Sequence, residues 1–283
     1  MSHVLGIDVG GTKVAIGISG SDGPSFESRL RLDTGPETLA RALEAARSLD
    51  GAPAAVGFST CGVIRDGVVR LAPNVPGWEG LELPRLLHEE YGATPVAIDN
   101  DVNAAAAAEL RWGALRGVTT GLYLNLGTGL AAALIVDGRV VAGAHGAAGE
   151  IGYLQTTPGE PAYADGRAPL EELVSGAALA ARGSAALGRP TSAAELLGGS
   201  VRLPFVDEAL ATLAMNVANL CAMVDPERLV VGGGMMGAAS LIMPRLGDEL
   251  RRAVPFPPRI EAARFADDAP LLGALALAHA AVR

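Results

Sequence analysis

Apolar runs separated by Gly-rich turns recur in the same order in the two halves of the chain. Residues 4–9 and 13–19 are apolar runs on either side of a Gly/Thr turn, and residues 119–126 and 130–136 repeat that arrangement. Apolar runs of this length between turn residues predict buried β-strands. Helical spacing of apolar residues follows in both halves, so the sequence predicts a duplicated α/β unit.

The rest of the pattern alternates between strands and helices. Further strands are expected at 26–32, 54–59, 95–98, 139–142, 228–232 and 259–263, with a short hairpin near 64–71. Helices are expected at 37–49, 81–91, 102–112, 169–187, 191–198, 205–224 and 238–253, with a last one from residue 270. Residues 153–168 show no periodicity and are expected to form a loop.

Composition narrows the class of protein. The 283 residues are 49% hydrophobic and 19% charged, which suits a large core in two domains or one large one. The net charge of −9 argues against a nucleic-acid partner, because phosphate backbones attract basic surfaces. Two cysteines are too few for a disulfide framework. With no apolar leader at the amino terminus and no membrane-spanning run, we expect a cytoplasmic protein without a membrane partner.

The two Gly/Thr turns align with each other and indicate phosphate binding. Asp8 aligns with Asn125, Gly10 with Gly127, and Gly11-Thr12 with Thr128-Gly129. Such a turn exposes backbone N–H groups that can hold phosphate oxygens, and two of them on two domains can hold a polyphosphate. The alternative is a pair of ordinary hairpins. A P-loop and a dinucleotide fingerprint are both excluded, because the required Gly spacing and helix are missing.

Several motifs, taken in order, resemble those of the ROK family of sugar kinases. They are Asp8–Lys13 and Leu126–Gly129 for phosphate, Pro73–Trp78 for sugar, Asp99–Ala105 for catalysis, Gly149–Tyr153 and Leu170-Glu171 for sugar, and Gly232–Gly234 for adenosine. Resemblance to this family implies a two-domain actin-like (RNase H-like) ATPase fold with duplicated βββαβα units. It also implies a small domain of residues 1–103 joined by the final helix 270–283, a large domain of residues 104–269, and a homodimer.

One departure from the family concerns zinc. Most members have a His where Tyr153 stands, followed by a Cys-rich run that holds zinc, whereas residues 154–168 contain no Cys or His. Zinc requires soft or imidazole ligands. We therefore predict that this chain has no structural zinc.

The resemblance makes Asp101 the candidate catalytic base. Phosphoryl transfer to a hydroxyl requires positioning, Mg²⁺ and a group that accepts the hydroxyl proton. The alternative is that Asp101, Asp99 or Asn100 caps the Ala-rich helix that follows. Asp8, beside the first turn, is the candidate for holding Mg²⁺ through water; as an alternative it is a turn residue that satisfies nearby N–H groups.

The remaining candidates divide between nucleotide and sugar. Those for ATP are Gly10, Gly11, Thr12, Lys13, Thr128, Gly129, Gly233 and Gly234, each of which could also be a plain turn or strand residue. Those for the sugar are Ser59, Asn74, Asn100, Asp101, Glu150, Tyr153 and Glu171, since sugar hydroxyls need acceptor carboxylates and amides. Glu171 could equally be a first-turn helix acid, and Tyr153 a core residue.

These residues predict an ATP-dependent kinase that phosphorylates the 6-hydroxyl of a hexose. Glucose is the family default; the stretch Ser59–Gly67 resembles N-acetylmannosamine kinases, and the altered residue 153 admits amino sugars such as kanosamine. The alternatives are a sugar-binding sensor or regulator of the same family, and polyphosphate as donor. Only seven residues precede Asp8, so a DNA-binding region before the first motif is not expected.

Overall fold

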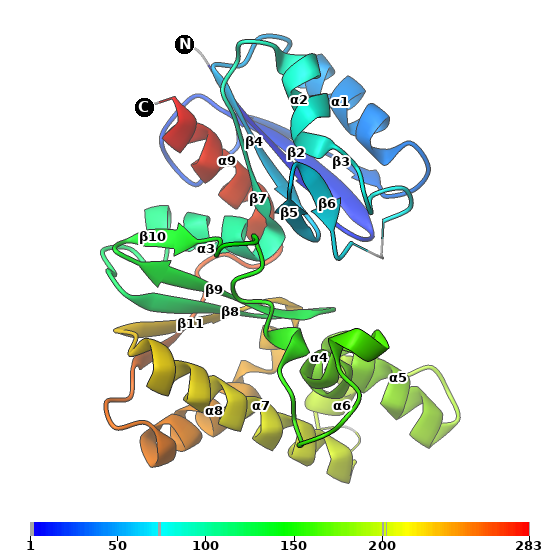
Figure 1. Cartoon of the computed structure of the whole chain (residues 1–283), viewed down its shortest axis with the longest axis vertical. Coiled ribbons are helices and arrows are strands. Elements are labelled where there is room, and N and C mark those ends of the chain that lie inside the picture. Colours follow the sequence, from blue (N-terminus) through cyan, green and yellow to red (C-terminus); the bar gives the residue numbers. More distant parts are fainter. Residues whose placement is uncertain (1–2, 73–74, 200, 202, 283) are drawn as a thin grey trace. The chain divides into compact units, whose positions relative to one another are not determined.

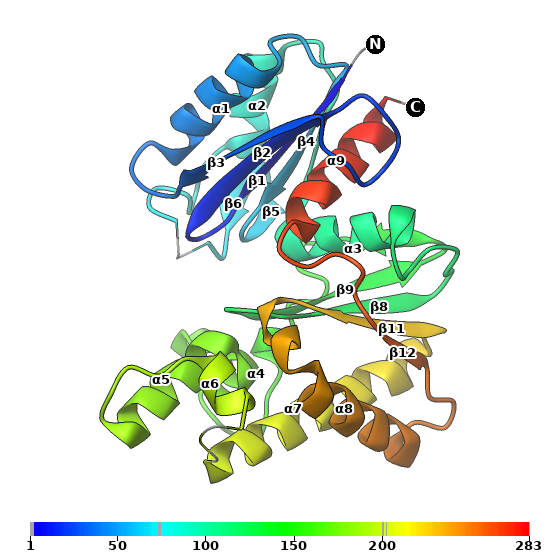
Figure 2. The same ribbon diagram turned by 180° about the vertical axis from the view of Figure 1, so that it is seen from behind.

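The chain folds into two compact units, each with its own sheet and core (Figure 1 and Figure 2). The computed structural model describes residues 3–72, 75–199, 201 and 203–282. The first unit comprises Met1–Arg116, Val140–Ala148 and Asp267–Arg283, and the second comprises Gly117–Arg139 and Gly149–Ala266.

The first unit contains a five-stranded mixed sheet with the order β3-β2-β1-β4-β7. Its strands are β1 (Val4–Val9), β2 (Lys13–Ser19), β3 (Ser28–Asp33), β4 (Ala55–Thr60) and β7 (Val96–Asn100). β1 is antiparallel to β2 and parallel to β4, and β4 is parallel to β7. A short hairpin of β5 (Val63–Arg65) and β6 (Val68–Arg70) follows β4.

Helices cover both faces of this sheet. α1 (Thr38–Leu49) and α2 (Leu83–Tyr91) lie on one face, and α9 (Ala269–Ala281) lies on the other, where it packs on β1, β4 and β7 (Figure 2). α3 (Asp101–Trp112) packs on α9. The close approach of α9 to β4 and to α3 depends on glycine. A Cβ on Gly57 of β4 would lie 1.7 Å from the Ala274 carbonyl oxygen of α9. A Cβ on Gly273 of α9 would lie 2.0 Å from the Ala104 carbonyl oxygen of α3.

The second unit repeats the sheet pattern of the first. Its strands β8 (Gly121–Leu126), β9 (Leu130–Val136), β11 (Arg228–Gly232) and β12 (Arg259–Ala262) have the order β9-β8-β11-β12. β8 is antiparallel to β9 and parallel to β11, which is parallel to β12. β10 (Arg139–Val141) contains the boundary between the two units. The matching strand directions confirm the predicted duplication.

The helices of the second unit lie between the sheet strands in the sequence. They are α4 (Pro169–Val174), α5 (Gly176–Leu187), α6 (Ala193–Leu197), α7 (Pro204–Val224) and α8 (Ala239–Ala253). α7 and α8 pack together, and their buried side chains join those of β8 and β11 in one hydrophobic core. In the part of the chain that the structure describes, no helix is both long and apolar enough to cross a membrane.

Most predicted elements are confirmed within two residues, but the continuous helix 169–187 is wrong. The chain adopts an extended backbone at Ser175, and α4 ends before it. Ser175 Oγ then accepts a hydrogen bond from the backbone N–H of Ala178, so it caps a new helix. Residues 153–168 form a loop as predicted, with a short 3₁₀ turn at Tyr163–Asp165.

The unit boundary lies after Arg116 rather than after residue 103. α3 therefore belongs to the first unit together with the final helix. The reason is the close packing of α3 on α9, which joins the helix that begins at Asp101 to the sheet that carries Asp8.

Candidate active site

The carboxyl ends of three parallel strands in the first unit bring polar side chains together. Asp8 of β1 lies opposite Ser59 of β4, and Thr60 of β4 lies opposite Asn100 of β7. Asp101 follows directly as the first residue of α3. Ligands of open α/β sheets bind beyond the carboxyl ends of the strands, so this edge is the candidate catalytic site.

Asp8 is a buried carboxylate whose ionised form is poorly solvated. Only 7% of the residue is exposed, and its Oδ1 accepts a hydrogen bond from Ser59 Oγ at 2.7 Å. Burial is the largest influence on its pKa and, with the nearby charge of Asp101, raises it to about 7 against the opposing effects of Ser59 and Lys13. A cation beside Asp8 would relieve this buried charge.

Ser59 acts on this site through Asp8. Its side chain is completely buried, and its hydroxyl donates to the Asp8 carboxylate. This placement gives Ser59 the role of orienting Asp8, whereas its direct contact with sugar stays a prediction.

Asp101 and Asn100 divide two roles that the sequence left open. Asn100 caps α3, because its Oδ1 accepts a 2.7 Å hydrogen bond from the backbone N–H of Asn103. Asp101 is therefore not needed as the cap. Dense surroundings raise the pKa of Asp101 to about 6 by desolvation, although the backbone N–H groups of Val102 and Asp101 lower it in part.

Asp99 fixes the geometry of this turn. Its Oδ1 accepts hydrogen bonds from the backbone N–H of Asn100 and from Nδ2 of Asn103, both at 2.8 Å. Burial raises the pKa of Asp99, which these two hydrogen bonds partly offset. Asp99 thus holds the strand-to-helix turn that carries Asp101.

The first Gly/Thr hairpin of the first unit is anchored by Thr34. The Thr34 hydroxyl donates to the Gly10 carbonyl oxygen at 2.7 Å, and its backbone N–H donates to the Thr12 carbonyl oxygen at 3.1 Å. Gly11, Thr12 and Lys13 remain exposed. Thr34 therefore fixes the backbone of the hairpin, while the residues at its tip stay accessible to a ligand.

The second Gly/Thr hairpin is held within the second unit by α4 and α5. The backbone N–H groups of Gly176 and Ala177 donate to the carbonyl oxygens of Gly127 (2.9 Å) and Thr128 (3.2 Å). Glu171 of α4 accepts a hydrogen bond from the Leu130 N–H at 2.8 Å. Glu171 therefore anchors this hairpin from the first turn of α4, and its predicted contact with sugar remains a prediction.

A cavity of about 430 Å³ lies beside this hairpin. Its walls come from the hairpin, the start of α5, α6 and the turn after β11, and apart from Thr128 the lining side chains are those of Gly, Ala, Leu and Met. Small-molecule sites are concave and mostly apolar with few polar groups. The size and lining fit a flat apolar ring system.

The two glycines predicted for adenosine have different roles in the turn after β11. Gly233 has a φ of 91°, and a Cβ there would lie 2.4 Å from the Leu126 carbonyl oxygen, so the backbone itself requires glycine. Gly234 lines the cavity, and so does its neighbour Met235. Gly129 does not line the cavity; a Cβ there would lie 2.8 Å from Glu171 Oε2.

The segment that carries Glu150 and Tyr153 is hydrogen-bonded to β9 through Gly149. Gly149, with a φ of 89°, accepts a 2.8 Å hydrogen bond from the Ala132 N–H, and a Cβ there would lie 1.9 Å from the Ala132 carbonyl oxygen. Glu150 precedes a 3₁₀ turn that ends at Tyr153. Asn74, the remaining predicted sugar contact, lies outside the described residues.

Carboxylates and an aromatic contact order the loop that follows Tyr153. Glu160 accepts hydrogen bonds from the backbone N–H of Thr157 (3.0 Å) and the hydroxyl of Thr156 (2.9 Å). The Tyr163 ring packs edge-on against Tyr153, with ring centroids 5.4 Å apart. These contacts order a stretch of the chain, residues 154–168, that contains no Cys or His.

Sequence reasoning missed the cavity walls and this loop network. Met235 lines the cavity, and so do Gly176 and α6. Their small apolar side chains carry no chemical signal in a sequence.

Mg²⁺ fits the first unit as a water-mediated partner of Asp8. Over the described ranges, no group of three or more His, Cys, Asp or Glu side chains is placed to hold a metal. Mg²⁺ does not need such a group, since it keeps several waters and uses one or two carboxylates plus substrate phosphates. Asp8, buried and with a raised pKa, suits that arrangement.

Comparisons with known proteins agree with the geometry. The chain is 33% identical to the N-acetylmannosamine kinase of Shigella flexneri over 98% of both chains. Among solved structures, it resembles a ROK hexokinase from Thermus thermophilus (32% identity, TM-score 0.79, 98% of both chains). It also resembles a ROK family glucokinase from Streptomyces griseus in complex with glucose and AMPPNP (26% identity, TM-score 0.79, 99% of this chain and 100% of that one).

The family model of the ROK family matches residues 4–281, nearly the whole chain. The structural neighbours have the actin-like ATPase fold, which confirms the predicted fold class. The chain belongs to the ROK family.

Proposed function

We propose that this protein is an ATP-dependent kinase that transfers the γ-phosphate to the 6-hydroxyl of a hexose or an amino or N-acetyl hexose. One observation carries the proposal: Asp101 stands at the carboxyl end of β7 beside Asp8, and Asn100 takes over the capping of α3. Because Asn100 is the cap of α3, the Asp101 carboxylate is not required for that role and is available for chemistry. Relatives named as N-acetylmannosamine kinase and glucokinase support the substrate class.

In the proposed reaction, Asp101 accepts the proton of the sugar hydroxyl. The hydroxyl oxygen forms a bond to the γ-phosphorus while the bond between that phosphorus and the β,γ-bridging oxygen breaks, and ADP leaves. With a pKa of about 6, Asp101 is ionised at pH 7 and is a better proton acceptor than an ordinary aspartate. Mg²⁺ held through water by Asp8 would offset the negative charge of the phosphates.

ATP is favoured over polyphosphate by the cavity of the second unit. Polyphosphate has no ring system, whereas an apolar cavity of about 430 Å³ beside a Gly/Thr hairpin suits a purine base next to its phosphates. In this proposal Thr128 and Gly234 lie against the nucleotide, and Gly233 shapes the turn that carries Gly234.

A screen of phosphate donors and sugar acceptors tests the whole proposal. Purified protein is incubated with Mg²⁺, ATP or polyphosphate, and a panel containing glucose, N-acetylmannosamine, N-acetylglucosamine and kanosamine. ADP release and ³¹P NMR of the product then report transfer and its position. We expect ATP-dependent 6-phosphorylation of at least one of these sugars. Sugar binding by calorimetry without transfer from either donor would contradict the proposal and favour a sensor or regulator.

A further inference from the structure

One wall of the cavity in the second unit is α6, a short helix, whereas the other walls continue from the sheet strands or are hydrogen-bonded to the hairpin between them. The hairpin wall belongs to β8 and β9, the start of α5 is hydrogen-bonded to that hairpin, and the Gly234 turn continues from β11. α6 consists only of Ala193–Leu197, and Ala193, Ala194 and Leu197 line the cavity. A helix this short has no stability of its own, so contacts with its surroundings must fix its position.

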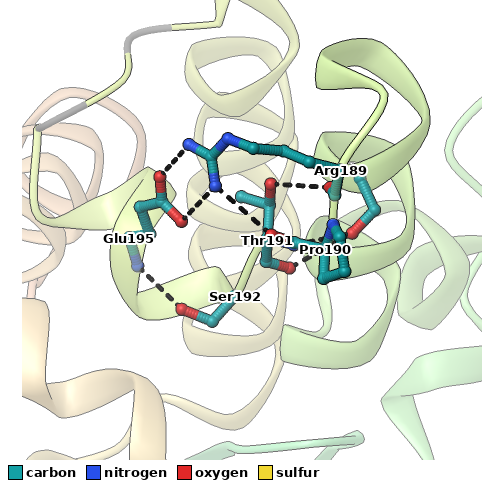
Figure 3. Close-up of polar contacts among 6 residues, drawn as sticks. Arg189, Pro190, Thr191, Ser192 and Glu195 are labelled. Atoms are coloured by element: carbon teal, nitrogen blue, oxygen red, sulfur yellow. Dashed lines mark hydrogen bonds and ion pairs between the residues drawn. The ribbon is translucent and has the colours of Figure 1, made fainter.

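A two-point ion pair joins the chain before α6 to the helix itself. Arg189 Nη1 donates to Glu195 Oε2 at 3.2 Å, and Nη2 donates to Oε1 (Figure 3). Arg189 Nη1 also donates to the Pro190 carbonyl oxygen at 3.3 Å. The forked geometry restrains orientation as well as distance, as a single-point lysine contact would not.

Two further contacts complete this connection. The Thr191 N–H donates to Ser184 Oγ of α5 at 2.9 Å, and Ser192 Oγ caps α6 by accepting from the Glu195 N–H at 3.1 Å. Leu196 packs closely against Gly183 of α5. A Cβ on Gly183 would lie 2.6 Å from Leu196 Cδ1. Glu195 thus supplies both the capped N–H and the carboxylate of the ion pair, as Figure 3 shows.

We propose that Arg189 and Glu195 are positioning residues for the nucleotide: their ion pair sets the α6 wall against the base, although neither side chain lines the cavity. This inference rests on the proposed function, because it takes the cavity occupant to be the purine of ATP. Breaking the pair loosens α6. Nucleotide binding must then also order α6, and this lowers the affinity for the nucleotide. The sugar contacts predicted at Glu150 and Tyr153 lie on a different segment and are unaffected.

The test compares matched carboxyl-to-amide changes in two Arg–Glu pairs. Glu195→Gln and Arg189→Gln each break the pair, and the double variant tests whether the two losses are shared. The control is Glu249→Gln, because Arg252 also grips Glu249 through two nitrogens on the surface of the same unit, at α8. The Kd of AMPPNP with Mg²⁺ and the Kd of the best sugar are measured by calorimetry, together with Tm.

We expect Glu195→Gln and Arg189→Gln each to raise the AMPPNP Kd about three- to fivefold, which is within the range of an ion pair whose side chains are partly exposed. The double variant should be no weaker than the weaker single, and the reversed pair Arg189→Glu/Glu195→Arg should recover part of the loss. The sugar Kd, and both Kd values of Glu249→Gln, should stay within twofold.

An AMPPNP Kd in Glu195→Gln that moves no more than in Glu249→Gln would overturn the inference. So would equal losses of nucleotide and sugar affinity with a lowered Tm, because that pattern indicates a merely structural role. A wild-type protein that binds AMPPNP but transfers no phosphate would refute the kinase proposal. The AMPPNP Kd values of Glu195→Gln and Glu249→Gln would still decide whether the ion pair positions the nucleotide. If the wild-type protein bound no adenine nucleotide, both the kinase proposal and the positioning role of the ion pair would be wrong.

Discussion

At the scale of single residues, two carboxylates carry the proposed chemistry: Asp8 is buried and Asp101 is partly buried. Asp8 and Asp101 both have pKa values raised chiefly by burial, to about 7 and about 6. The sequence could place them, since both follow strands and lie in motifs. It could not reveal the burial that raises their pKa values, nor the division of work between Asn100 and Asp101, because these depend on side-chain surroundings.

The raised pKa of Asp101 predicts an acid limb in the rate profile. A base must be ionised to accept a proton, so at Mg²⁺ concentrations that keep Asp8 ionised kcat/KM should fall about tenfold per pH unit below pH 6. Asp8, with a pKa of about 7, should add a second limb, since its protonation competes with Mg²⁺. Raising Mg²⁺ should shift that limb to lower pH and leave the one near 6. A rate independent of pH from 5 to 8 would contradict this assignment.

Replacing Asp8 should stabilise the protein at high pH. A carboxyl whose pKa is raised on folding binds more protons in the folded state, so its ionisation costs stability as pH rises from about 4 through 7. Asp8→Asn removes that charge but can still accept from Ser59. We expect its free energy of unfolding to exceed wild type by on the order of 1 kcal/mol or more at pH 8, with the gain disappearing by pH 4.

Asp268 offers a control of opposite sign. Burial would raise its pKa, but hydrogen bonds from Arg31 and Arg29 outweigh burial and lower it. Asp268→Asn should therefore lose stability at pH 8, by less than about 1 kcal/mol, and approach wild type in acid. Denaturant melts of both variants at pH 4, 6 and 8 measure the two trends. A stability loss in Asp8→Asn at pH 8 would contradict the account.

At the scale of elements, sequence patterns predicted the strands and most helices, and their failures are local. Strand runs and the final helix are strongly apolar, so their periodicity was clear. The helix 169–187 was predicted as continuous because Ser175 is a mild helix former, and only its capping of α5 reveals the break. The cavity walls at α6 and Gly176 could not be predicted, because Gly and Ala contribute space rather than chemical groups.

The approach of α9 to its neighbours predicts a strict requirement for glycine. A methyl group at Gly273 would lie 2.0 Å from the Ala104 carbonyl oxygen, so Gly273→Ala must push α9 away from α3. We expect a loss of about 1–3 kcal/mol, as in other overpacked cores. Gly51→Ala is the matched control in the same unit, since its nearest neighbour would be 3.9 Å away. Equal melting temperatures for the two variants would show that α9 packs differently.

The loop after Tyr153 predicts a protein that needs no structural zinc. Glu160, together with the Tyr153–Tyr163 contact, orders this loop, and residues 154–168 contain no Cys or His. Elemental analysis of purified protein should find well below one zinc per chain, and a zinc-selective chelator should leave activity intact when Mg²⁺ is maintained. About one zinc per chain would mean a ligand set outside those considered.

At the scale of the whole molecule, duplication gives each unit one part of the proposed chemistry. The first sheet ends in Asp8 and Asp101, and the second ends in a Gly/Thr hairpin beside an apolar cavity. The duplicated Gly/Thr turns could be read from the sequence, as could the family. The proposed division between a catalytic edge and a nucleotide cavity required the structure, because the cavity is built from four separate segments.

The most direct test of the account is the turnover of Asp101→Asn. The amide keeps the size of the carboxylate but cannot take up the hydroxyl proton, so kcat for sugar-dependent ADP release should fall by about 10²–10⁴. The Kd values for sugar and AMPPNP should stay within a few-fold of wild type, since only an interaction in the transition state is removed. A kcat close to that of the wild-type protein would contradict the central claim that Asp101 is the catalytic base.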